Sequence, residues 1–125
     1  MNTPVSLSLA RLLKDKKFDE PCISFYDLVS NHQINNTPLG NYNLTKQSVS
    51  IPTIADVVMW LYKKHGIWIY ADSHEFGKWC YNYKFNRPHE LNPRITENGK
   101  FSLEDYNSPS EAYEAGIEYT LNNLI

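Results

Sequence analysis

The sequence has few of the residues that build familiar active sites. Its five glycines are scattered over 125 residues, so it contains no Gly-rich loop of the kind that cradles a phosphate. The Gly-x-Ser-x-Gly motif of serine hydrolases is missing too. We therefore predict that the protein is not an enzyme, and we expect no cofactor.

Charge of one sign and long apolar runs are also missing. Twelve Lys and Arg residues against fourteen Asp and Glu give a formal net charge of −2, which creates no overall positive field to attract nucleic acid. No apolar run has the length that a bilayer requires, and the first 17 residues do not show the pattern of a signal peptide. A cytoplasmic protein is expected.

Cysteine and histidine are too few and too scattered to indicate a site. Cys22 and Cys80 are expected to be reduced and buried, as is usual in the cytoplasm. A catalytic thiol would need a histidine brought close by the fold, and Cys80 lies in an aromatic strand where a structural thiol is typical. No histidine has the spacing of a zinc site, so solvated histidines are favoured over metal ligands. The four histidines are His32, His65, His74 and His89.

Aromatic residues, in contrast, are abundant, with nine Tyr, five Phe and three Trp. Such side chains favour β-strands. Ile67–Ala71 and Lys78–Phe85 alternate between two faces, and the turn Ser73–Gly77 between them predicts an antiparallel hairpin. A further strand is expected at Cys22–Val29, and Lys100–Tyr106 would add a third strand to the hairpin.

Two helices are predicted in the first half of the chain. The first has an apolar stripe that includes Leu9, with Thr3 or Ser6 as its cap. The second begins with the capping-box pattern Thr53-Ile54-Ala55-Asp56 and ends before Gly66. Its buried stripe is predicted to consist of Ile54, Val57, Val58 and Leu61.

A third helix is predicted to begin at Ser108-Pro109-Ser110-Glu111, where a Ser cap, an N-terminal Pro and a Glu coincide. Residues 35–50 are rich in turn-forming residues and predict a loop, within which Tyr42–Leu44 would pair as an edge strand. The predicted fold class is α+β, with a small, mainly antiparallel sheet, about three helices and the order αβ-loop-αββ(β)α. We expect one domain over 1–125, with a possible boundary in the loop 35–50 between an N-terminal part of this domain and the rest.

The aromatic hairpin is the main candidate for a functional surface. It would form one broad π surface for stacking if the register brings its aromatic residues together. Alternatively, the same residues form the core on which the helices pack, and this alternative is favoured because large exposed apolar patches are rare. The candidate residues are Trp68, Tyr70, Trp79, Tyr81 and Tyr83.

A basic cluster at the end of the first helix is the second candidate surface. It consists of Arg11, Lys14, Lys16 and Lys17. A solvated helix end, where cations complement the helix dipole, is favoured over a phosphate site.

Several of these segments together resemble a group of small proteins from phages and mobile elements of gut Bacteroidetes. They are Pro52-Thr53, Trp60-Leu61, His65-Gly66-Ile67-Trp68-Ile69 and Glu111-Ala112-Tyr113-Glu114-Ala115-Gly116-Ile117. The resemblance covers mainly the last 75 residues. It implies a bacterial cytoplasmic setting and an accessory role, but no activity, cofactor or functional residue.

The sequence as a whole favours a small binding or accessory protein that acts through protein contacts. Tyr and Trp are typical of interfaces because they bury a large area and keep a polar group. The alternative is a nucleic-acid-binding module that uses the aromatic face and the basic cluster, and an enzyme of unknown class ranks third. We expect no membrane association and a monomer or weak homo-oligomer.

Overall fold

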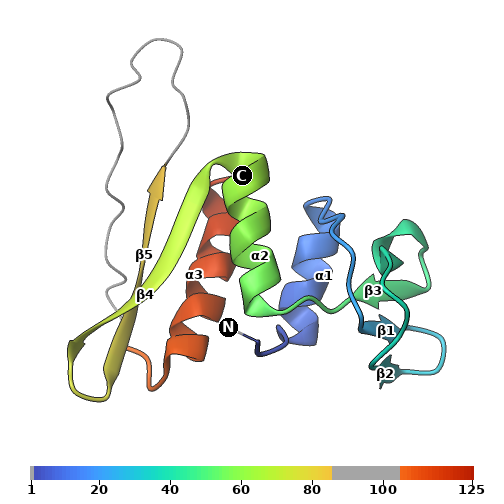
Figure 1. Cartoon of the computed structure of the whole chain (residues 1–125), viewed down its shortest axis with the longest axis horizontal. Coiled ribbons are helices and arrows are strands. Elements are labelled where there is room, and N and C mark those ends of the chain that lie inside the picture. Colours follow the sequence, from blue (N-terminus) through green and yellow to red (C-terminus); the bar gives the residue numbers. More distant parts are fainter. Residues whose placement is uncertain (1, 86–104) are drawn as a thin grey trace, which may run out of the picture. The chain divides into compact units, whose positions relative to one another are not determined.

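The computed structural model describes residues 2–85 and 105–125. Three α-helices and two small antiparallel sheets in these ranges confirm the α+β class. The chain divides into two compact units, Met1–Asp56 and Val57–Ile125, which are described separately below (Figure 1). The single domain stays a prediction. None of the described helices combines the length and apolar character needed to cross a membrane.

The first unit contains one α-helix and one small sheet. Helix α1 spans Leu7–Asp15. The sheet has the strand order β2–β1–β3, with β1 at Phe25–Asp27, β2 at His32–Ile34 and β3 at Ser48–Ser50. A single 3₁₀ turn, η1, at Tyr42–Leu44 precedes β3.

The strand predicted at Cys22–Val29 is confirmed in part, and the edge strand predicted at Tyr42–Leu44 is wrong. Strand β1 covers only Phe25–Asp27, and it ends there because the Asp27 carboxylate accepts a hydrogen bond from the amide of Val29, at 3.0 Å, and turns the chain. The edge strand expected at Tyr42–Leu44 is the 3₁₀ turn η1. Asn41 caps this turn by accepting a hydrogen bond, also 3.0 Å long, from the amide two residues on.

The two ends of α1 are both stabilised by local hydrogen bonds. Of the two predicted caps, Ser6 is used, and its Oγ accepts from the amide of Leu9 at 3.3 Å. At the other end the amide of Phe18 donates to the carbonyl of Leu13 at 3.0 Å, as in a Schellman motif. Lys17 takes the left-handed position of this motif, with φ at 69°, where glycine is the usual residue.

The second unit is built on the predicted hairpin. Strand β4 spans Ile67–Glu75 and β5 spans Lys78–Phe85, so β4 is longer than predicted. Helix α3, Pro109–Asn123, packs against both strands (Figure 1). Helix α2, Ile54–Trp60, crosses the division between the units and continues as a π-helical turn, η2, at Leu61–His65.

The predicted caps of α2 and α3 are confirmed. Thr53 and Asp56 exchange hydrogen bonds, each side chain accepting from the other residue's amide at 3.2 Å. Ser108 Oγ accepts from the amide of Glu111 at 3.2 Å, and Gly66 ends η2 with φ at 65°. The predicted stripe of α2 is buried at Ile54, Val57, Val58 and Leu61.

The third strand predicted at Lys100–Tyr106 lies largely outside the described residues. At the end of the predicted strand, Tyr106 forms an antiparallel bridge with Trp79. The two residues exchange backbone hydrogen bonds of 2.9 and 2.7 Å. The side of β5 that faces away from β4 is therefore paired at this position.

Candidate functional site

The hairpin register separates the predicted aromatic residues. Trp68 pairs with Lys84, and Ile69 pairs with Tyr83. Residues that pair across a ladder share a face, and neighbours along a strand lie on opposite faces. The register therefore does not bring the five candidate residues onto one π surface. Trp68 and Tyr70 lie on one face, and Trp79, Tyr81 and Tyr83 lie on the other.

The face with Trp79, Tyr81 and Tyr83 is the one that receives α3. Gly116 of α3 lies directly over the Tyr81 side chain. Tyr83 stacks on Tyr119 with ring centroids 5.8 Å apart. These aromatic residues therefore support the helix, as the core interpretation expects, although each of their side chains is only half-buried.

The opposite face carries a half-exposed group of large side chains. Four of them are exposed: Lys84, Met59 by 42%, Tyr62 by 39% and Tyr70 by 37%. Trp68 is half-buried, and its ring meets that of Tyr62 edge-on, with centroids 5.6 Å apart and an interplanar angle of 82°. We call this group, Met59, Tyr62, Trp68, Tyr70 and Lys84, the Trp68 surface.

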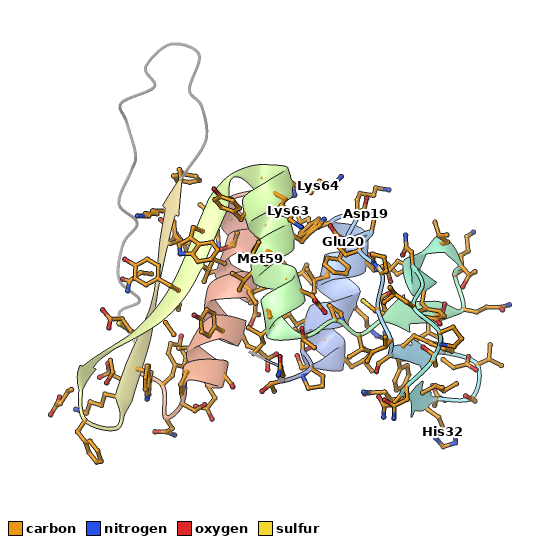
Figure 2. All side chains as sticks on the ribbon, in the orientation of Figure 1. Asp19, Glu20, His32, Met59, Lys63 and Lys64 are labelled. Atoms are coloured by element: carbon orange, nitrogen blue, oxygen red, sulfur yellow. The ribbon has the colours of Figure 1, made fainter. Side chains whose placement is uncertain are left out.

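A shallow hollow lies within the Trp68 surface. Its volume is about 410 Å³, and it is lined by Met59, Tyr62, Trp68 and Lys84. Lys63 stands one turn beyond Met59 on the same helical segment, as the labels in Figure 2 show. The lining is apolar except for the cationic end of Lys84, whose carbon stem can lie along an aromatic ring. Such a hollow suits an apolar side chain accompanied by negative charge.

The hollow depends on the way α2 leads into β4. The π-helical turn Leu61–His65 widens the end of the helix and carries Tyr62, and single π-helical turns are frequent at functional sites. Gly66 then takes the left-handed conformation that reverses the chain. Trp68 follows two residues later, and its ring packs edge-on against that of Tyr62. A helix end, a glycine and the first residues of a strand together build the hollow.

The predicted basic cluster is not a set of four free cations. Lys14 Nζ donates hydrogen bonds to the carbonyl oxygens of Thr45 and Ser48, the latter at 2.7 Å. It thereby connects α1 to the segment around β3. Arg11 and Lys17 are exposed and Lys16 is half-buried. Two of the three N–H donors of the Lys14 ammonium are therefore already used within the protein.

The two thiols are free, and both are buried. Burial raises the pKa of Cys22 to about 11, and the charge of Asp56 adds to this effect. Burial, followed by the charge of Asp72, also raises the pKa of Cys80. Since the thiolate is the nucleophile, neither side chain is activated at neutral pH.

Among the residues that the structure describes, the histidines are not gathered into a metal site. His32 is exposed on β2, and the ring of His65 meets that of Trp60 edge-on at 4.9 Å. His89 lies outside the described residues. Within the described ranges, no three His, Cys, Asp or Glu residues converge as metal ligands would.

Sequence reasoning identified Trp68 and Tyr70 but missed Met59, Tyr62 and Lys84. The available signal was that Met59 and Tyr62 are large, three residues apart and outside the buried stripe of α2. Lys84 joins them only through the register of the hairpin. Comparisons with protein-family models, with curated proteins and with solved structures found no match.

Proposed function

We propose that this chain is an interaction module that binds a protein partner through the Trp68 surface. The observation that carries the proposal is the hollow of about 410 Å³ between Met59, Tyr62, Trp68 and Lys84. Large aromatic and Met side chains in a desolvated centre, surrounded by polar groups, are the usual source of binding free energy at protein interfaces.

The exposure of these residues supports a role in binding rather than in the core. Met59 and Tyr62 are exposed by 42% and 39%, although the same helical segment buries Val57, Val58 and Leu61 completely or nearly so. The part of these side chains that stays exposed contributes nothing to folding, because that area remains hydrated. A partner that covers the rings would gain about 25 cal/mol for each Å² of apolar area removed from water.

A cytoplasmic setting and an accessory role in a phage or mobile element belong to the proposal. The resemblance stated above supports both. The free thiols Cys22 and Cys80 support the setting, because a reducing compartment keeps cysteines in this form.

Photo-crosslinking would test the proposal at matched positions. A benzoylphenylalanine at Tyr70, exposed by 37%, should yield protein adducts in the native host, and these adducts should survive nuclease treatment. The same probe at Tyr119, exposed by 36% and on the opposite side of the hairpin, should yield far fewer. Trp68→Ala should reduce the Tyr70 adducts at least about tenfold, as loss of a central interface residue does. Equal yields at both positions would contradict the proposal.

Single-stranded nucleic acid is the second candidate, and Lys84 favours it. Lys84 lines the hollow together with Tyr62 and Trp68, and stacking on aromatic rings beside a cation is typical of such sites. This alternative requires oligonucleotide binding that weakens steeply as salt is raised. Titration of a labelled oligonucleotide at low salt, with Trp68→Ala as the comparison, would decide it. Absence of binding at low salt would remove this candidate.

A further inference from the structure

The tip of the β4–β5 hairpin presents an aromatic side chain that the hairpin itself does not need. Phe76 and Gly77 form the turn between Glu75 and Lys78, and Gly77 supplies the positive φ, 75°, that the turn requires. Phe76 is fully exposed. Polar residues are usual in such turns, and a Phe side chain gains free energy when it is buried. Phe76 is therefore available to a partner.

The tip and the hollow lie at opposite ends of the same hairpin. Trp68 and Lys84 pair near its base, and Phe76 follows Trp68 by eight residues along β4 and the turn. At a rise of about 3.3 Å per residue, the separation is roughly 25 Å. The paired strands hold this distance, so Phe76 cannot fill the hollow of its own chain. It can fill the hollow of another copy.

The chemistry of the tip complements that of the hollow. The hollow is apolar, with the cation of Lys84 on its wall, and Phe76 is directly preceded by the carboxylate of Glu75. Glu75 is paired with Lys78 at 3.3 Å, but both side chains are at least half exposed. An exposed pair of this kind contributes little to stability, so Glu75 can exchange Lys78 for Lys84 of another copy at little cost.

We infer that two copies of this chain exchange hairpin tips, with Phe76 of each copy in the hollow of the other and Glu75 beside Lys84. This inference rests on the proposed function and names a second copy as the partner. Two hairpins that lie antiparallel bring both tips to both hollows at once. The result is a closed, two-fold dimer in which no tip or hollow is left to add further copies.

Analytical ultracentrifugation over a range of concentrations tests the dimer. The wild-type mass should rise from 14.6 kDa toward twice that value. Phe76→Ala should raise the dissociation constant at least about tenfold, and it leaves folding intact because the side chain is fully exposed. Leu44→Ala, which removes another strongly exposed apolar side chain at 81% exposure, is the matched control and should change nothing.

Mixing two variants tests the exchange itself. The Phe76→Ala variant has an intact hollow but lacks the aromatic side chain at its hairpin tip. The Trp68→Ala variant has an intact tip but lacks one wall of its hollow. Each variant alone should stay monomeric where the wild type is dimeric. A mixture should form a heterodimer with one intact contact, detected by capture of the untagged variant on the tagged one.

A charge exchange tests the role of Glu75. Glu75→Lys and Lys84→Glu should each weaken the dimer, because each places like charges together. The double variant should restore it, since the reversed charges meet again in the other copy. Loss of the intrachain pair with Lys78 would not be rescued in this way.

Two outcomes would overturn the inference. One is a wild-type protein that remains at 14.6 kDa at every concentration; the other is a dimer that Phe76→Ala leaves unchanged. If protein adducts still form at Tyr70 in either case, the proposed function stands with a different partner. If Tyr70 gives no adducts either, both fail.

Discussion

A Cβ atom added to Gly116 would lie 2.9 Å from Cγ of Tyr81 and 3.0 Å from its Cβ. Both distances are shorter than an ordinary van der Waals contact. Helix α3 thus approaches β5 as closely as it does because residue 116 has no side chain. Glycine at this position costs the helix about 1 kcal/mol relative to alanine. In exchange, glycine allows the helix to pack closely on the hairpin.

Gly116→Ala should therefore destabilise the protein even though alanine is the better helix former. Overpacking of a tight contact costs about 1–3 kcal/mol, which exceeds the gain in propensity of about 1 kcal/mol. We expect a net loss of about 1 kcal/mol in the free energy of unfolding, measured by urea denaturation. In a Tyr81→Ala background the penalty should shrink by at least about 0.5 kcal/mol. An equal penalty in both backgrounds would show that Tyr81 is not the cause.

Lys17→Gly should stabilise the protein. Lys17 has φ at 69°, a conformation that costs a residue with a Cβ about 1 kcal/mol and costs glycine almost nothing. We expect a gain of about 0.5–1 kcal/mol in the free energy of unfolding by thermal or urea denaturation. Lys16, with φ at −91°, provides the control, because glycine there brings no relief of strain. If Lys16→Gly and Lys17→Gly both raised the free energy of unfolding, the cause would be the loss of a positive charge and not the relief of backbone strain.

The elements that the sequence predicted well are those with local signals. The capping box of Thr53 and Asp56 and the Ser108 cap lie within four residues each, and the caps form as expected. The alternation from Lys78 to Phe85 likewise needs only the strand itself. Strands of three residues have no such pattern, so β2 and β3 were not predicted, although the predicted strand Cys22–Val29 contains β1.

The candidate surface depends on relationships that are not local. Trp68 and Lys84 become neighbours only through the register of the hairpin, and a shift of one residue would move every side chain to the other face. Tyr62 joins them through a π-helical turn, a departure from the period on which helix prediction rests. The sequence therefore indicated the aromatic residues but not the face on which each would lie.

Removing the ammonium group of Lys14 should destabilise the first unit. Lys14 Nζ donates to the carbonyl oxygens of Thr45 and Ser48, and hydrogen bonds from charged groups contribute about 1.5–3 kcal/mol when buried. Because the site is only partly buried, we expect Lys14→Met to lower the free energy of unfolding by about 1–2 kcal/mol. Arg11→Met, on an exposed neighbouring position, should stay within about 0.5 kcal/mol of the wild type. If Lys14→Met and Arg11→Met lowered the free energy of unfolding equally, Lys14 would act only through its charge and not through its hydrogen bonds.

Alkaline pH should destabilise the protein in part through Cys22. Its pKa rises from 9.0 to about 11 on folding, mainly because the thiol is buried. Between these values the unfolded chain releases the proton more readily than the folded one, so stability falls as pH rises through this window. Below pH 9 the contribution is fully present.

Urea denaturation at several pH values between 8 and 10.5 would measure this effect on the wild type and on Cys22→Ala. The variant loses packing at every pH, but its stability should fall less steeply above pH 9, because it has no thiol to ionise. Contributions from groups other than Cys22 are common to both proteins and cancel in the difference between them. Alkylation of folded Cys22 at pH 8 should also be much slower than that of a free thiol. Parallel pH profiles for the two proteins would show that the Cys22 thiol ionises alike in the folded and unfolded chain.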